Sequence, residues 1–236
     1  MTEAVPPVIL IPGYWLGGWA WSAVAGQLRS VGLTVTSLTL PGLESPETSR
    51  EGVGFADHVD AVIDALPVEG KAVLVAHSGA GAVATAVLDQ VPDRVARVVY
   101  IDSGPVPDGY VSDPDLDPNA VDLPLPRFEE LEAQGISLAG LDQPALQRFR
   151  EDAAPHPAGV VTAKVELRNP QRNDVPATVV CCSFPSTMVA QAIDEPMFAP
   201  LRELTDVTFV DLPTGHWPMW SRPEELATVI EEATRT

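Results

Sequence analysis

The sequence predicts an α/β protein with a mostly parallel sheet that has helices on both faces. Two observations predict this class. Short apolar runs that do not alternate with polar residues recur along the 236 residues, and such runs are typical of strands buried on both faces. Segments with apolar residues at helical spacing separate most of these runs, as in a succession of βαβ units.

Six strands follow from the apolar runs, each short and bounded by turn-forming residues. Their expected ranges are 8–11, 33–40, 72–76, 95–101, 177–183 and 207–212. The main helical patterns lie near 19–31, 55–66, 82–88 and 188–203, with a final helix near the C-terminus. In a parallel sheet, the loops that follow the strands gather at one edge, and open α/β sheets bind their ligands there.

The regular alternation is interrupted once, between the fourth and fifth strands. Residues 103–175 are rich in proline and contain only two short helical patterns, near 127–134 and 144–154. Proline lacks a backbone N–H donor, so long regular structure is not expected in the first part of this segment. We interpret residues 1–236 as one domain in which residues 103–175 form a small cap over the strand ends.

Charge and composition exclude several classes of partner. The chain has 33 acidic and 14 basic residues, a net charge of −19, which argues against binding to nucleic acid or to an anionic membrane. No apolar window approaches a membrane span, and the N-terminus lacks the features of a signal peptide. We therefore expect a cytoplasmic protein. Nothing in the sequence predicts its oligomeric state.

The two cysteines, Cys181 and Cys182, are adjacent in an apolar run. Neighbouring cysteines rarely meet the geometry of a disulfide. We expect both to be buried residues of a strand in a protein from a reducing compartment.

The strand over 72–76 runs into the helix over 82–88 through Ala76-His77-Ser78-Gly79-Ala80. A serine at a sharp strand-to-helix turn, with small residues on both sides, predicts a nucleophile elbow. The small residues are needed because the turn is strained and the strand and helix pass close to each other. The usual pattern is G-x-S-x-G, and here alanine replaces both outer glycines. The alternative is that Ser78 only caps the helix.

His216 follows the last expected strand, in Thr214-Gly215-His216-Trp217-Pro218. A histidine on that loop can reach the elbow and act as the general base for Ser78. The other three histidines fit this role less well. We expect His58 to be solvated on a polar helix face, His156 to lie in the cap, and the side chain of His77 to point away from Ser78.

The acid that orients the histidine normally follows the penultimate strand, but that strand ends here in Cys182-Ser183-Phe184-Pro185 without one. Asp102 stands at the end of the strand after the elbow strand, and that end also faces the expected site. We predict that Asp102 orients His216. The alternatives are Asp194, a turn-stabilising role for Asp102, and a Ser–His dyad without an acid.

The loop after the first strand begins Pro12-Gly13-Tyr14-Trp15. An oxyanion that forms during acyl transfer needs two aimed hydrogen-bond donors. We predict that the backbone N–H groups of Tyr14 and Gly79 supply them. We further expect Trp15 and Trp217, together with the cap, to wall an apolar substrate pocket.

At this point the chain resembles the α/β-hydrolase superfamily, in particular the small esterases related to plant methylesterases and hydroxynitrile lyases. The segment Pro12-Gly13-Tyr14-Trp15-Leu16-Gly17-Gly18-Trp19-Ala20-Trp21 is similar to their H-G-x-x-x-G-x-W-x-W loop. The elbow and Gly215-His216 match in the same order. The resemblance implies an α/β-hydrolase fold, a serine nucleophile, a histidine base, and no cofactor or metal.

Three departures from this group bear on function. Pro12 replaces the histidine that usually precedes Gly13, and the acid after the penultimate strand is missing. Haloalkane dehalogenases of similar fold place an acid at the end of the strand after the elbow, as at Asp102, but they need a carboxylate where this chain has Ser78. The lyases usually carry lysine after the catalytic histidine, whereas Trp217 stands here, which disfavours cyanohydrin cleavage.

These features predict a serine hydrolase that cleaves a small or medium carboxylic ester through an acyl-enzyme intermediate. Its expected partner is a small ester-like molecule. Two alternatives belong to other classes. One is a ligand-binding or sensor protein that has kept a hydrolase fold without turnover. The other is a different Ser/His reaction, such as C–C bond hydrolysis, lactone opening or a lyase step.

Overall fold

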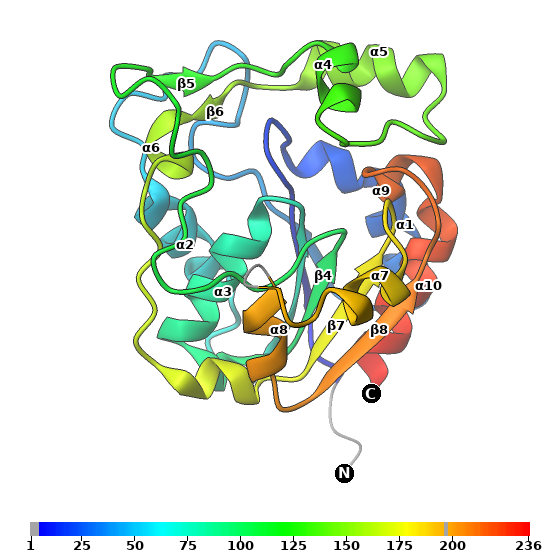
Figure 1. The fold of residues 1–236 in the computed structure, drawn as a ribbon. Coiled ribbons are helices and arrows are strands. Elements are labelled where there is room, and N and C mark those ends of the chain that lie inside the picture. Colours follow the sequence, from blue (N-terminus) through cyan, green and yellow to red (C-terminus); the bar gives the residue numbers. More distant parts are fainter. Residues whose placement is uncertain (1–4, 196–197) are drawn as a thin grey trace.

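A parallel six-stranded sheet forms the centre of the molecule in the computed structural model, which describes residues 5–195 and 198–236 (Figure 1). The strand order is β2-β1-β3-β4-β7-β8, and every neighbouring pair is parallel. The strands are β1 (Val8–Ile11), β2 (Val35–Ser37), β3 (Ala72–His77), β4 (Val95–Ile101), β7 (Ala177–Cys181) and β8 (Val207–Asp211). The six expected strands and the α/β class are confirmed.

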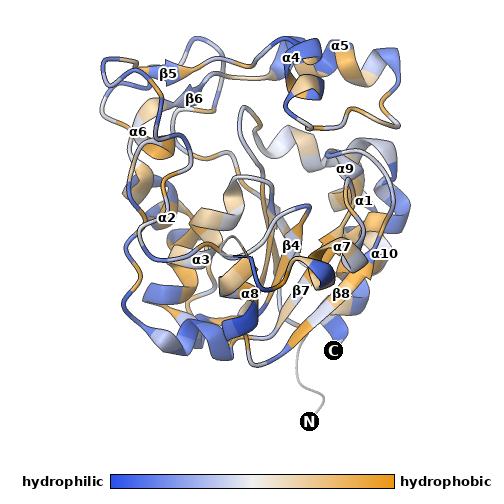
Figure 2. Cartoon of the chain, in the orientation of Figure 1, coloured by the Kyte–Doolittle hydropathy of each residue, from blue (hydrophilic) through white to orange (hydrophobic). Residues whose placement is uncertain are grey.

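The central strands are apolar because both of their faces are covered. Every residue of β1, β3 and β7 is buried, whereas the edge strand β8 is partly exposed. In Figure 2 the middle of the sheet is hydrophobic, and the outward faces of the surrounding helices are hydrophilic. Side chains alternate between the faces of a strand. Thus Val8 and Leu10 belong to one core, and Ile9 and Ile11 belong to the other.

Helices cover both faces of the sheet. On one side, α1 (Ser22–Ser30) and α10 (Pro223–Arg235) pack against the sheet with short η1 (Gly18–Trp21) and α9 (Pro218–Ser221) nearby. On the other side lie α2 (Phe55–Ala65) and α3 (Ala80–Gln90). A short η2 (Pro92–Arg94) leads from α3 into β4. This arrangement leaves the carboxyl ends of the strands open to the loops that carry the candidate site.

The middle of the proline-rich segment lies over those strand ends, at the top of Figure 1, and its last part runs down the side of the molecule to α3. It contains a two-stranded antiparallel sheet of β5 (Asp122–Leu123) and β6 (His156–Pro157). The two predicted helical patterns are present as α4 (Phe128–Ala133) and α5 (Gln143–Asp152). Short α6 (Ala158–Val161) and η3 (Pro170–Asp174) follow and lead back to β7. The rest of the segment is irregular, as its proline content predicts.

One helical prediction was too long. The pattern near residues 188–203 forms two short helices, α7 (Ser186–Gln191) and α8 (Ala199–Glu203). Cys181 and Cys182 are buried and unpaired, as expected, but only Cys181 belongs to β7, and Cys182 directly follows that strand. Within the described ranges, no helix has the length and hydropathy needed to cross a bilayer.

Candidate active site

The turn between β3 and α3 holds Ser78 in a left-handed backbone conformation, with φ of 53°. Small neighbours make this turn possible. A side chain at Gly79 would overlap the ring of Tyr14, and one at Gly81 would overlap the hydroxyl of Ser103. The same hydroxyl donates to the backbone oxygen of Ser78 at 2.6 Å. The strand-turn-helix geometry is that of a nucleophile elbow, and it presents the Ser78 hydroxyl at the carboxyl edge of the sheet.

Three predicted residues form one continuous hydrogen-bonded chain. The hydroxyl oxygen of Ser78 lies 2.8 Å from Nε2 of His216, and Nδ1 of His216 lies 2.6 Å from Oδ2 of Asp102. Because a carboxylate only accepts hydrogen bonds, the proton of the neutral imidazole resides on Nδ1. Nε2 is then free to accept the proton of Ser78. The three groups come from different elements of the chain, and the structure brings them together at one edge of the sheet.

Asp102 is enclosed and fully hydrogen-bonded. Its side chain is only 1% exposed. Its Oδ1 accepts the N–H groups of Cys182 and Ser183 at 3.0 and 2.9 Å, and its Oδ2 accepts the hydroxyl of Ser183 at 2.6 Å. Burial raises the pKa of Asp102, but the hydrogen bonds from His216 and Ser183 outweigh burial and hold that pKa below its usual value. The carboxyl group is therefore an anion placed to stabilise a positive imidazole.

Sequence reasoning missed the contribution of Ser183. The signal was present, because a hydroxyl residue lies just after β7, where the acid of this arrangement usually lies. Asp194, the alternative acid, has a side chain that is 91% exposed and forms an ion pair with Arg202 at 3.1 Å. Asp102 occupies Nδ1 of His216, so the geometry favours Asp102 over Asp194.

His77 holds the backbone of His216 in place through a hydrogen bond. Its Nε2 lies 2.7 Å from the backbone oxygen of His216, to which it donates, and the two imidazole rings are 4.9 Å apart. As expected, its side chain does not reach the hydroxyl of Ser78. Burial, followed by the neighbouring His216, lowers the pKa of His77 to about 3. His77 is therefore a neutral hydrogen-bond donor that fixes the backbone of the His216 loop, a role the sequence analysis did not assign.

The cap holds the same loop from the other side. The N–H groups of Gly215 and His216 donate to the backbone oxygens of Ala139 and Ser137, at 3.1 and 2.8 Å. A side chain at Gly215 would collide with the backbone of Ala139, so this close approach requires glycine. His216 is thus fixed by both the body of the domain and the cap.

The expectation that His58 is solvated was wrong. Its side chain is fully buried, and its Nε2 donates to the backbone oxygen of Pro41 at 2.9 Å. The ring packs edge-on against His156 of the cap, with the centroids 5.4 Å apart. Burial lowers the pKa of both histidines. On α2, the position of His58 beside Val59 faces inward, and the Pro41 oxygen satisfies its N–H.

The loop after β1 lies directly against the nucleophile. A side chain at Gly13 would approach within 2.9 Å of the Ser78 Cβ atom, which only glycine avoids. The backbone N–H groups of Tyr14 and Gly79 donate to no other group in the described part of the chain. Both donors are therefore unused by the described chain, and their binding of an oxyanion stays a prediction.

An apolar cavity of about 800 Å³ opens beside Ser78, within the size range of ligand pockets. One wall is the first part of the cap, residues 103–112, and the other is formed by α7, α8 and nearby residues. The apolar lining comprises mainly Val106, Val179, Phe184, Met188, Val189, Phe198 and Leu201. The described lining contains no lysine or arginine, and its single carboxylate, Asp102, is bound to His216 and Ser183.

Trp15 and Trp217, which we expected in the pocket wall, do not line this cavity. Both are buried in the core on the α1/α10 side of the sheet. The ring of Trp217 packs against Phe149 and Trp220, which also contact each other, and the indole N–H of Trp15 donates to the backbone oxygen of Leu123. An aromatic residue on a loop at the edge of a sheet can face the core or the ligand, and these two face the core.

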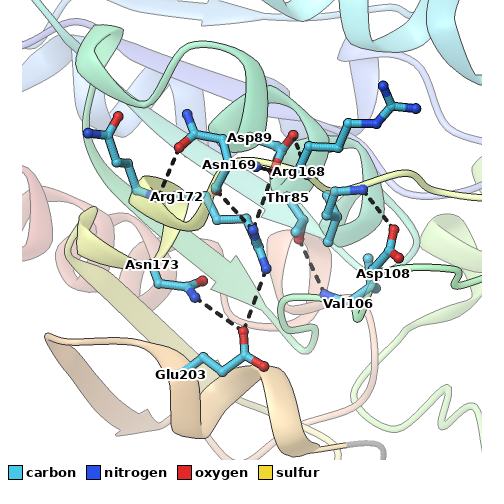
Figure 3. Close-up of polar contacts among 11 residues, drawn as sticks. Thr85, Asp89, Val106, Asp108, Arg168, Asn169, Arg172, Asn173 and Glu203 are labelled. Carbon is cyan, nitrogen blue, oxygen red and sulfur yellow. Dashed lines mark hydrogen bonds and ion pairs between the residues drawn. The ribbon is translucent and has the colours of Figure 1, made fainter.

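A polar network fixes both walls of the cavity from outside (Figure 3). Asp89 of α3 accepts the backbone N–H of Asn169 at 2.8 Å and pairs with Arg172 at 3.4 Å. Arg172 also lies 3.6 Å from Glu203 of α8. Asp108 accepts the backbone N–H of Leu167 at 2.9 Å. These hydrogen bonds and ion pairs therefore connect the cap, α3 and α8 on the outside of the apolar cavity.

Within the described ranges, no group of three or more His, Cys, Asp or Glu side chains is placed to hold a metal ion. What the site can do chemically follows from its polar groups. It can deprotonate a hydroxyl, stabilise a negative oxygen with two N–H donors, and return a proton from an imidazolium.

Relatives with named activities match this chain over most or part of its length. A carbendazim-hydrolysing esterase from Nocardioides sp. (strain SG-4G) is 28% identical over 240 residues, which cover 93% of this chain and 96% of that protein. Methylesterase 18 of Arabidopsis thaliana is 31% identical over 105 residues, 43% of this chain and 40% of that protein. At the level of ester hydrolysis, these names agree with the activity that the sequence predicts.

Solved structures share the fold over nearly the whole chain. An extracellular alpha/beta-hydrolase from a Paenibacillus species has a TM-score of 0.75 at 22% identity, covering 98% of this chain and 100% of that one. A pyrethroid hydrolase from Sphingobium faniae JZ-2 has a TM-score of 0.72 at 21% identity, covering 99% and 98%. The model of the alpha/beta hydrolase family matches residues 8–229. The chain therefore belongs to the alpha/beta hydrolase family, as its elbow and strand order predict.

Proposed function

We propose that this protein is a serine esterase that hydrolyses carboxylic esters through an acyl-enzyme intermediate. One observation carries the proposal: the unbroken hydrogen-bonded chain from Asp102 through His216 to Ser78, with distances of 2.6 and 2.8 Å. A serine hydroxyl alone is a weak nucleophile, and an adjacent oriented base is what activates it. The relatives named as esterases support the same reaction class.

The reaction proceeds in two halves. Nε2 of His216 takes the proton as Ser78 Oγ attacks the ester carbonyl, and Asp102 stabilises the imidazolium. The imidazolium then gives the proton to the leaving alcohol oxygen, and the acyl group stays on Ser78. A water molecule, deprotonated by His216, attacks the acyl carbon, and the proton returns to Ser78 as the acid leaves.

The negative oxygen of each tetrahedral intermediate is bound by the N–H groups of Tyr14 and Gly79. Neither donor is used by the described parts of the protein itself. Donors held in place before the reaction need no reorganisation, and losing one such donor typically costs about 10²–10³ in kcat. Pro12, in place of the histidine of related loops, does not remove either N–H.

The cavity favours the acyl part of an uncharged ester. The cavity opens at Ser78, and its lining includes Asp102 but not His216. The leaving alcohol must lie near His216 to receive its proton, and the acyl part then points into the cavity. Apolar walls without a cation give no compensation for burying a carboxylate, so a charged acyl group is disfavoured.

The test is hydrolysis of p-nitrophenyl esters of increasing acyl length, together with labelling by a fluorophosphonate. Wild type should turn over these esters and be labelled. Ser78→Ala should lose at least about 10³-fold in kcat/KM and all labelling. Equal, slow hydrolysis by both proteins without labelling of the wild type would refute the esterase proposal.

The same test separates the alternatives. A ligand-binding protein on this fold would bind esters tightly without turnover and without an adduct on the serine. A C–C hydrolase or lactonase would be labelled at Ser78 but would act poorly on simple esters, and product analysis would identify its reaction.

A further inference from the structure

In the described chain, three residues other than glycine have a left-handed backbone. They are Ser78 with φ of 53°, Asp102 with φ of 45°, and Trp15 with φ of 65°. Such conformations cost about 1–3 kcal/mol each and persist where the surrounding structure holds them. Ser78 and Asp102 belong to the proposed Ser–His–Asp group. This leaves Trp15, a bulky residue for which positive φ is rare, without an assigned reason.

Trp15 directly follows the proposed oxyanion donor in a tight turn. The N–H of Leu16 donates to the backbone oxygen of Gly13 at 3.4 Å, which makes Gly13 and Leu16 the ends of the turn. Trp15 is the third residue, the position at which a type II turn needs positive φ and usually has glycine. Because peptide planes are rigid, the conformation of Trp15 helps to set the direction in which the Tyr14 backbone faces.

The cap binds every polar group of Trp15. Its indole N–H donates to the backbone oxygen of Leu123 at 3.0 Å, and its backbone oxygen accepts the N–H of Ala154 at 2.9 Å. Its backbone N–H points to Nδ1 of His156 at 3.5 Å, the weakest of the three. The ring of His156 also packs on the ring of Tyr14, with the centroids 4.4 Å apart. The strained turn is thus held by residues more than 100 positions away in sequence.

We propose that Trp15 is a positioning residue through which the cap holds the oxyanion-binding loop in its active conformation. The proposal rests on the serine-esterase function and on the role of the Tyr14 N–H. Without these contacts, Trp15 relaxes toward negative φ, and the Tyr14 N–H no longer points toward the oxyanion. The oxyanion exists only in the transition state and the tetrahedral intermediate, so kcat falls while substrate binding is retained.

The first variant is Trp15→Phe, which keeps an aromatic ring in the core and deletes the indole N–H that reaches the cap. Trp220→Phe is the matched control, because it deletes an indole N–H bound to a backbone oxygen, that of Ala20, at the same 3.0 Å. We expect Trp15→Phe to lose about tenfold in kcat, a fraction of the effect of removing a donor. KM should stay within about twofold, and the rate of fluorophosphonate labelling should fall in parallel.

A pair of variants at His156 tests the same contact without changing Trp15. His156→Asn keeps an acceptor close to the position of Nδ1, whereas His156→Leu removes it. The kcat of His156→Asn should stay within about threefold of wild type. His156→Leu should lose more kcat, by the amount expected for the loss of one neutral hydrogen bond. Thermal unfolding of each variant shows whether the protein is folded at the assay temperature.

Two results would overturn the proposal while leaving the esterase intact. One is a kcat for Trp15→Phe equal to that of Trp220→Phe, with His156→Leu equal to His156→Asn. The other is a raised KM with unchanged kcat in Trp15→Phe, which would make Trp15 a binding residue. Wild-type activity equal to that of Ser78→Ala would overturn both the esterase and the positioning role, and so distinguishes the two failures.

Discussion

The Ser–His–Asp group and the walls of the cavity beside it are built by different kinds of contact. In the group, the polar atoms of Asp102 and His216 are joined by hydrogen bonds as short as 2.6 Å, on a rigid sheet edge. The walls are apolar side chains from residues 103–112 and two short helices. Polar partners fix geometry tightly because hydrogen bonds are directional. Apolar contacts fill space without one required geometry.

We infer that the hydrogen-bonded group determines the rate of the chemical step, whereas the apolar walls determine which esters bind. Changes in the hydrogen-bonded group should affect kcat for every ester. Changes in the walls should affect some esters and leave others alone. The predictions below test that separation, beginning with the largest expected effect.

Replacing the acid should cause the largest loss after removal of Ser78. Asp102→Asn keeps the shape of the side chain but removes the charge that stabilises the imidazolium and can favour the wrong tautomer of His216. In a serine protease with the same group of residues, the equivalent change costs about 10⁴ in kcat. We expect a loss of about 10³–10⁴ for every ester, measured by steady-state kinetics. Asp194→Asn is the control, since Asp194 is exposed, and it should retain full activity. A large loss of activity in Asp194→Asn instead would show that Asp102 is not the acid of the group.

Ser183→Ala tests whether the Ser183 hydroxyl, just after β7, contributes to catalysis. It removes one hydrogen bond of 2.6 Å to Asp102 and leaves the two backbone donors. A hydrogen bond to a charged group contributes about 1.5–3 kcal/mol, so kcat should fall about 10- to 100-fold. Ser186→Ala is matched, because its hydroxyl also bonds a carboxylate, that of Asp211, at 2.7 Å on the surface. Equal effects of the two variants would contradict a special role for Ser183.

A larger side chain in the wall should discriminate between substrates. Val106→Phe puts a ring into the cavity, and kcat/KM for a long acyl ester should fall about tenfold, in the range expected for lost apolar binding. An acetyl ester needs little of the cavity and should change less than about twofold by the same reasoning. Val68→Phe, at an exposed loop residue, controls for a general effect. Equal losses with both esters would show that the wall also sets the chemistry.

The buried histidines predict a smaller effect, on stability rather than on rate. The pKa values of His58, His77 and His156 are lowered in the folded protein, mainly by burial. The unfolded chain therefore binds protons first as pH falls below about 6.5. The free energy of unfolding should then decrease from pH 7 to pH 5, by up to about 1.4 kcal/mol per pH unit for each histidine.

Urea denaturation at several pH values measures this slope. His58→Gln keeps a donor for Pro41 but does not titrate, so it should make the slope shallower. An unchanged slope would mean that His58 does not titrate on unfolding in this range.

The same contrast explains what the sequence could predict. Ser78, His216 and Asp102 were identifiable because each follows a recognisable strand, and all parallel strands end at one edge. Their partners were less visible. His77 and Ser183 act through single hydrogen bonds that depend on side-chain direction, which strand order alone does not fix.

The cavity walls were not predictable for a different reason. Apolar residues at helical spacing near residues 188–203 look alike whether they pack on a core or line a cavity. The division into α7 and α8 did have a sequence signal, because Pro196 lies between the two helices in the sequence and proline interrupts a helix, but the predicted range ran through it. Trp15 and Trp217 were placed in the pocket because they flank the site in sequence. The structure places their rings in the core, where the packing of Phe149 and the cap determines their direction.

The most direct test of the central claim is to trap the acyl-enzyme. The protein is mixed with a p-nitrophenyl ester, quenched in acid during turnover, digested, and examined by mass spectrometry. We predict an acyl group on the peptide that contains Ser78, formed as p-nitrophenol is released and absent from Ser78→Ala. Turnover without any acylated peptide, or an acyl group on another residue, would contradict the proposed role of Ser78.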